Sequence, residues 1–154
     1  MKKYSPKTKR ELQELISDES VYLGDIDTSN ITDMSKLFFE DESGTEIHRL
    51  DFSGISSWDV SGCENMSGMF HSCYYFNQPL DNWDVSSVEF MSFMFDTALS
   101  FNADISGWNV GRFTSVRSMF CCAKSFKQDI SGWKLVDERK KELHKGRNRY
   151  SSYV

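Results

Sequence analysis

The chain has 154 residues, of which 39 % are hydrophobic and 14 % aromatic, and its formal net charge is −5. This length fits one domain. No apolar run is long enough to cross a membrane, and the lysine-rich N-terminus lacks the apolar segment and small-residue cleavage site of a secretory signal. We therefore expect a cytoplasmic protein, or one at the cell surface if an upstream signal has been removed.

Charge is distributed unevenly along the chain. Residues 1–10 carry five positive charges and no negative one, residues 11–133 carry 20 acidic and 6 basic side chains, and residues 134–154 carry 7 basic and 3 acidic ones. The acidic middle would repel phosphate groups, so direct binding to nucleic acid is not expected. It suits a partner protein with a basic surface.

The N-terminal residues predict a helix followed by a strand. Thr8 and Glu11 form a T-x-x-E capping box, and Leu12 and Ile16 follow at helical spacing, so a helix is expected over residues 8–18. Residues 21–26 favour a short strand. We expect residues 1–24 to form a cap on the body that follows.

That body, residues 25–133, is organised by a 25-residue period. Trp58, Trp83, Trp108 and Trp133 recur at this interval, and a diverged first copy precedes them over residues 25–38. A period of this length is typical of solenoid architectures. The first copy holds about seven extra residues, in the polar segment 40–49, which we expect to be a loop.

Within each copy the apolar residues predict a short helix. Their spacing of three and four places helices near residues 62–72, 87–97 and 112–122, supported by S-x-x-E capping boxes that end at Glu64 and Glu89. The segments that lead to each Trp are expected to be extended, with one short strand or strand-like step per copy. Residues 134–154 predict a capping helix over 136–145 and a basic tail. The fold class expected is thus an α/β repeat solenoid of about four coils, with helical caps at both ends.

The sequence elements W-D-V-S-x-x-x-x-M-x-x-M-F and F-N-Q-x-[LI]-x-x-W resemble the BspA-like bacterial surface repeats, which are related to leucine-rich repeats. The resemblance covers residues 25–133. It implies a right-handed spiral of short coils and a role in protein contact or adhesion.

Catalytic and metal-binding constellations are not evident in the sequence. Four cysteines, Cys63, Cys73, Cys121 and Cys122, are predicted to be free thiols. No C-x-x-C pair exists and the three histidines are scattered, so a zinc site is not expected. No cofactor is predicted. Repeated carboxylates could suggest paired catalytic acids. Because they recur in each copy, we expect them to hold backbone amides at turns instead, and we predict no enzymatic activity. These carboxylates are Asp59, Asp84, Asp104 and Asp129.

Two groups of residues are candidates for contact with a partner. Aromatic side chains break the repeat pattern at Tyr74, Tyr75, Phe90 and Phe93, and exposed aromatic residues are favoured at interfaces. The second group is the set of acidic residues in the inserted segment, namely Glu40, Asp41, Glu42 and Glu46.

The leading hypothesis is a non-enzymatic module that binds another protein. The alternatives are an acidic inhibitor or immunity-type protein that blocks a nucleic-acid enzyme, and a surface adhesin.

Overall fold

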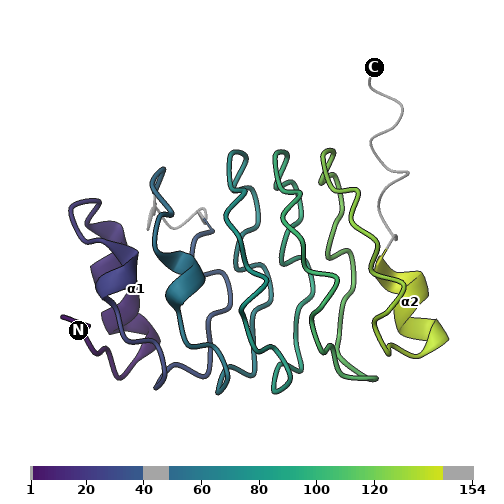
Figure 1. The fold of residues 1–154 in the computed structure, drawn as a ribbon, viewed down its shortest axis with the longest axis horizontal. Coiled ribbons are helices and arrows are strands. Elements are labelled where there is room, and N and C mark those ends of the chain that lie inside the picture. The colour runs from purple at the N-terminus through teal and green to yellow at the C-terminus, as the bar shows by residue number, and fades with distance from the viewer. Residues whose placement is uncertain (1, 40–48, 144–154) are drawn as a thin grey trace.

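The computed structural model describes residues 2–39 and 49–143. The chain forms a row of similar turns that lie side by side, with helix α1 (Lys9–Ser17) at one end and helix α2 (Asp137–Leu143) at the other (Figure 1). Between them the described residues contain only two short 3-10 helices, η1 (Leu23–Asp25) and η2 (Ile55–Ser57), and isolated β-bridges.

The predicted α/β repeat solenoid is therefore wrong. The helices expected near residues 62–72, 87–97 and 112–122 are absent, and the described part of the chain contains no strand, only single bridging residues. The strand expected over residues 21–26 is replaced by η1. The apolar residues do recur every three or four positions, but the backbone that carries them makes tight turns.

The hydrogen bonds of the third copy, which begins at Trp83, show why no helix forms there. The amides of Met91, Phe93 and Phe95 donate to carbonyl oxygens of the next turn, at 2.7, 2.9 and 3.0 Å. The amides of Met94 and Asp96 instead close local turns. They donate to the carbonyl oxygens three residues earlier, those of Met91 and Phe93, at 3.2 and 3.1 Å. A helix would need these amides to donate to the fourth residue before. The three-residue spacing of apolar side chains thus reflects successive hydrogen-bonded turns.

Left-handed backbone recurs at equivalent places in these turns. A positive φ at the third residue of a hydrogen-bonded turn is the mark of a type II turn, which favours glycine because other residues meet a steric penalty there. Only one residue of this set is glycine, and the φ angles range from 52° to 63°. The residues form two rows across the turns: Lys36, Gly68, Phe93 and Ser118 in one, and Ser72, Thr97 and Cys122 in the other.

Helix α1 confirms the helix predicted over residues 8–18. The hydroxyl of Thr8 accepts a hydrogen bond from the amide of Glu11 at 3.2 Å, and the Glu11 carboxylate accepts one from the amide of Lys7 at 2.6 Å. Leu12 and Ile16 are fully buried and belong to the hydrophobic core. The N-terminal helix therefore covers one end of the core.

The capping boxes expected at Glu64 and Glu89 do not form. The amide of Glu64 donates to the carbonyl of Thr32, and the amide of Glu89 donates to the carbonyl of Glu64, each at 2.8 Å. These amides therefore join neighbouring turns instead of starting helices. The same region supplies the parallel bridges, which link Asp33 to Asn65, Asn65 to Phe90, and Phe90 to Ser115.

The four tryptophans occupy matching positions in successive turns. Each is almost completely buried, and each indole N–H donates to a backbone carbonyl of the preceding turn. The rings of Trp83, Trp108 and Trp133 stack with centroids 6.4 and 6.3 Å apart. The indole donors and their carbonyl acceptors are Trp58 to Leu23 at 2.9 Å, Trp83 to Ile55 at 3.2 Å, Trp108 to Leu80 at 2.9 Å and Trp133 to Ile105 at 3.2 Å.

Two columns of phenylalanine rings run beside the indoles. Within a column the ring centroids are 5.5 to 5.9 Å apart, and between the two columns they approach to 4.0, 3.8 and 4.0 Å. Aromatic pairs at such distances add to the apolar burial that stabilises a core. The columns are Phe70, Phe95 and Phe120, and Phe76, Phe101 and Phe126.

The fourth copy, which begins at Trp108, departs from the repeat at one position. Alignment by the 25-residue period places Phe113 in the buried column of Cys63 and Val88, but the Phe113 side chain is 72 % exposed. Thr114 is buried instead, and its hydroxyl donates to the carbonyl of Val88 at 3.1 Å. The local chain has shifted by one residue, which places a large ring in solvent.

Hydrogen bonds from the side chain of Arg49 connect its segment to the end of α1 and to the residues that follow α1. Its buried side chain donates to the carbonyl oxygens of Asp51 at 2.6 Å and Ile16 at 3.2 Å, and to that of Val21. Buried charged groups need such hydrogen bonds to offset the loss of hydration. Nothing in the sequence pattern marked this arginine as structural.

Helix α2 closes the other end of the row. It lies within the helix predicted over residues 136–145, with Leu143 buried. The amide of Val136 donates to the carbonyl of Arg112 at 3.1 Å, and the carbonyl of Glu142 accepts from the amide of Ser118 at 3.0 Å. At this end of the row, α2 stands in the place of a further turn and accepts the hydrogen bond from the Ser118 amide.

We predict that Trp108→Ala lowers the free energy of unfolding by about 3–5 kcal/mol, because it removes a large buried ring. Trp108→Phe keeps a stacked ring but leaves the buried Leu80 carbonyl without its donor, at a cost of about 1–3 kcal/mol. Urea denaturation followed by fluorescence measures both. Phe113→Ala, at an exposed ring, is the control and should change stability by less than about 0.5 kcal/mol. Equal losses for Trp108→Ala and Phe113→Ala would contradict the buried indole column.

We predict that Thr97→Gly raises the free energy of unfolding by about 0.5–1 kcal/mol, because a β-branched residue is strained at positive φ. Thr97→Ala removes the same hydroxyl but keeps a Cβ, so it should give no such gain. The two variants are compared by thermal unfolding. A gain for alanine equal to that for glycine would show that the left-handed backbone is not the cause.

Candidate functional site

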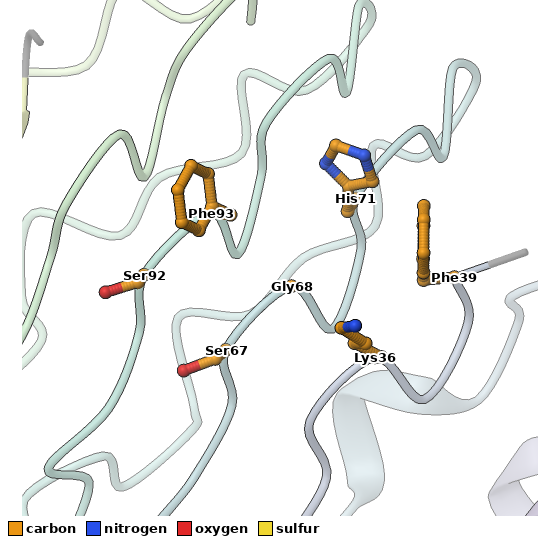
Figure 2. Close-up of a pocket in the computed structure, with 7 residues that line it drawn as sticks. All are labelled: Lys36, Phe39, Ser67, Gly68, His71, Ser92 and Phe93. Atoms are coloured by element: carbon orange, nitrogen blue, oxygen red, sulfur yellow. The ribbon is translucent and has the colours of Figure 1, made fainter. Parts of the chain in front are cut away.

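A surface hollow opens across three neighbouring turns (Figure 2). Its volume is about 260 Å³. Figure 2 shows Gly68 between Phe93 and Lys36, with the rings of Phe39 and His71 beside them. The lining residues are Lys36, Phe39, Ser67, Gly68, His71, Ser92 and Phe93. We call this set of residues the aromatic hollow.

The hollow exists because one row of the turns contains a glycine. Lys36, Gly68 and Phe93 occupy equivalent left-handed positions, so their side chains start from adjacent points on neighbouring turns. Gly68 has no side chain, and the space beside it stays open. A Cβ at this position would lie 3.4 Å from Cγ of Lys36 and 3.9 Å from Cβ of His71.

The walls of the hollow combine aromatic rings with a few polar groups. The rings of Phe39 and His71 meet edge to face at 4.5 Å, and the Lys36 ammonium lies 5.8 Å from the centroid of Phe39. The hydroxyls of Ser92 and Ser115 share a hydrogen bond of 2.8 Å. A few polar groups in a largely apolar recess are typical of a site that takes an apolar side chain and fixes its orientation.

The structure brings some of the predicted contact residues together and leaves others apart. Phe93 lines the aromatic hollow and is 39 % exposed; Phe90, 48 % exposed, lies three residues earlier in the same turn. Tyr74 and Tyr75 are 49 % and 81 % exposed but do not line it. The acidic candidates Glu40, Asp41, Glu42 and Glu46 lie outside the described residues.

Sequence reasoning missed Lys36, Phe39, Gly68 and His71 as parts of this site. The period itself carried the signal, because aligning the copies places Gly68 directly between Lys36 and Phe93. A small residue between two large ones in a stacked row predicts a gap. The expected helices hid this, since they would have turned these positions to different faces.

The repeated carboxylates are structural, as predicted. Asp59 and Asp84 each accept hydrogen bonds from the amide and the hydroxyl of the serine two residues later, at 2.6 to 3.0 Å. Asp104 and Asp129 accept from the corresponding serine amides at 2.9 Å. Hydrogen bonds from the serine hydroxyl and then the serine amide hold the pKa of Asp84, Asp104 and Asp129 below the usual value.

The four cysteines are free thiols, as predicted. Cys63 is fully buried and Cys73 partly so, and burial raises their pKa to about 11 and about 12. Such thiols stay protonated and react slowly. The sulfur atoms of Cys121 and Cys122 lie 3.6 Å apart near Asp96. Burial, followed by the hydrogen bond with Cys122, raises the pKa of Cys121 to about 12.

We predict that the protein loses stability in acid. The carboxyls of Asp84, Asp104 and Asp129 have lowered pKa values in the folded chain, so their contribution is complete above the unfolded-state value of about 4. It disappears as the pH falls from there through the lowered folded values. Urea midpoints measured between pH 7 and pH 3 should therefore decrease at the acid end.

The control for this prediction removes the serine hydroxyls, which are the largest cause of the lowered pKa values. A chain with Ser86→Ala, Ser106→Ala and Ser131→Ala should lose less stability between neutral and acid pH than the original. Identical pH profiles for the two chains would contradict the role given to these turns.

Comparison with known proteins identifies a family but no individual relative. Among the described residues no helix is long and apolar enough to cross a membrane. No curated protein and no solved structure matches the chain. A family model described as "Mycoplasma protein of unknown function, DUF285" matches residues 42–146, which is more than half of the chain. The chain therefore belongs to the DUF285 family of Mycoplasma proteins of unknown function.

Proposed function

We propose that this chain is a non-enzymatic module that binds another protein through the aromatic hollow and the adjoining ring of Phe90. The observation that carries the proposal is the exposure of two large rings on one turn, 48 % for Phe90 and 39 % for Phe93. At the position of Phe90 the neighbouring turns carry Asn65 and Ser115, and at the position of Phe93 they carry Gly68 and Ser118. Packing of the core does not require rings at either place.

The surface around these rings is held in place before a partner arrives. The amide of Phe93 donates to the carbonyl of Arg117 at 2.9 Å, and the carbonyl of Phe90 accepts from the amide of Met66 at 2.8 Å. Because the backbone on both sides is fixed, little conformational entropy is lost when a partner docks. Rigid aromatic side chains of this kind often supply much of the binding energy of an interface.

Charge near the rings indicates what the partner carries. Glu64 and Glu89 are exposed, and they lie on neighbouring turns where the Glu89 amide donates to the Glu64 carbonyl. Glu64 directly precedes Asn65 in the sequence and Glu89 directly precedes Phe90, and these two residues form one of the parallel bridges. A partner that inserts an apolar side chain into the hollow and places a cationic group beside these carboxylates fits this surface.

The resemblance to BspA-like surface repeats supports a role in protein contact, and under the adhesin alternative the partner would be a protein of another cell. The acidic-inhibitor alternative is favoured by the exposed Asp84, Asp104 and Asp129, whose lowered pKa values keep them ionised. Binding dominated by exposed charges would weaken strongly with added salt. Binding dominated by the rings of the hollow would not.

We predict that Phe90→Asn with Phe93→Ser weakens partner capture at least tenfold, because it removes the two rings. These substitutions introduce the residues that neighbouring turns hold in the same rows, Asn65 and Ser118, so the fold should tolerate them. The immobilised chain is incubated with extract of its source cell, and bound proteins are identified by mass spectrometry. Thermal unfolding checks that the double variant remains folded.

The matched control is Phe113→Ser, which removes an exposed ring that does not line the hollow. The proposal requires a protein that the original chain and the Phe113→Ser chain retain and that the double variant loses. Equal capture by all three chains would contradict it. Loss of capture in about 1 M salt by the original chain would favour the acidic-inhibitor alternative.

A further inference from the structure

Stacking of the turns brings together donor groups that are 25 residues apart in the sequence. His71, Asp96 and Cys121 hold equivalent positions in three successive turns, and Cys122 follows directly. The amide of Ser72 donates to the carbonyl of Asp96 at 2.9 Å, which fixes this register. A carboxylate oxygen of Asp96 and the sulfur atoms of Cys121 and Cys122 all lie within 4.8 Å of one another.

The spacing of the two sulfur atoms suits a bound metal ion. They are 3.6 Å apart, and the two thiols are not joined in a disulfide. Zinc–sulfur bonds of about 2.3 Å in a tetrahedral site place two sulfur ligands about 3.8 Å apart. The thiols therefore need to move by only a few tenths of an ångström to bind one ion together.

His71 provides a second, independent observation. Its buried Nδ1 atom makes no hydrogen bond in the described part of the chain, although it lies 3.2 Å from Oδ2 of Asp96. Carboxylates and histidines at metal sites are usually oriented by a neighbouring polar group. His71 therefore lies where it can orient the Asp96 carboxylate beside the two sulfur atoms.

We propose that Asp96, Cys121 and Cys122 bind one Zn²⁺ ion, with His71 as a positioning residue for the Asp96 carboxylate. Two thiolates and a carboxylate form a donor set that zinc accepts, and hard ions such as Mg²⁺ and Ca²⁺ prefer oxygen ligands alone. On binding, each thiol releases its proton to solvent and a sulfur–zinc bond forms. Water occupies the remaining position of the tetrahedron.

An ion at this site would link neighbouring turns near the C-terminal end of the row. The amide of Thr97 already donates to the carbonyl of Cys121 at 2.7 Å, so the two turns are in register before the ion binds. Zinc that binds only the folded chain stabilises it. The site goes beyond the proposed partner binding, and its test does not depend on a partner.

The experiment titrates the full, reduced chain, freed of metal by chelation, with Co²⁺ and then with Zn²⁺. We expect tetrahedral cobalt absorption and a thiolate-to-cobalt charge-transfer band that saturate at one ion per chain and disappear when Zn²⁺ is added. Cys121→Ser and Cys122→Ser should each weaken binding at least tenfold and reduce the charge-transfer band. Asp96→Asn should weaken binding similarly but retain the band from both sulfurs.

His71→Ala should weaken binding about tenfold without changing the cobalt spectrum at saturation, as expected of a residue that acts through Asp96. Cys73→Ala, at a thiol outside the cluster, is the matched control and should bind as the original chain does. As a second measurement, Zn²⁺ should raise the thermal midpoint of the original chain and leave that of Cys122→Ala unchanged. No saturable binding by the original chain, or binding that survives loss of both Cys121 and Cys122, would overturn the proposal.

Discussion

The register of 25 residues between neighbouring turns is the constraint on which the rest of this structure depends. It is maintained by three sets of contacts: indole N–H groups bonded to the preceding turn, columns of stacked phenylalanines, and alternate backbone amides that donate to the next turn. Because each turn contributes single bridging residues, no turn could hold its shape alone. Helices α1 and α2 cover the two ends, where a core built in this way would otherwise meet water.

Some of this could be predicted from the sequence, but the strand expected over residues 21–26 and the helices and strands expected within the copies were wrong. The period, the helix over residues 8–18 and the structural role of the aspartates followed from residue type and spacing alone. The helices expected within the copies did not form, because apolar residues three apart fit a series of type II turns as well as they fit a helix. Such turns place residues at positive φ, which a helix does not, but the residues that adopt it here, such as Phe93 and Thr97, are not of types that indicate it.

The candidate site was predictable only in part, for the same reason. Phe90 and Phe93 were identified because they break the repeat. Phe39 and His71 line the hollow only because their turns lie next to each other and to the turn of Phe93. Cys121 and Cys122 are adjacent in the sequence and Asp96 precedes Cys121 by 25 residues, a spacing that matches no common zinc motif. Stacking of the turns brings the Asp96 carboxylate to the two sulfur atoms. In this chain, rows of equivalent positions are therefore more informative than linear motifs.

The central claim is that neighbouring turns, and not helices, use the backbone amides. The most direct test is the scalar coupling across a hydrogen bond, measured by NMR at the amide of Phe95. We expect coupling to the carbonyl carbon of Met119 in the next turn, where the amide nitrogen lies 3.0 Å from the carbonyl oxygen. Coupling to the carbonyl carbon of Met91, the helical partner four residues before, would contradict the account.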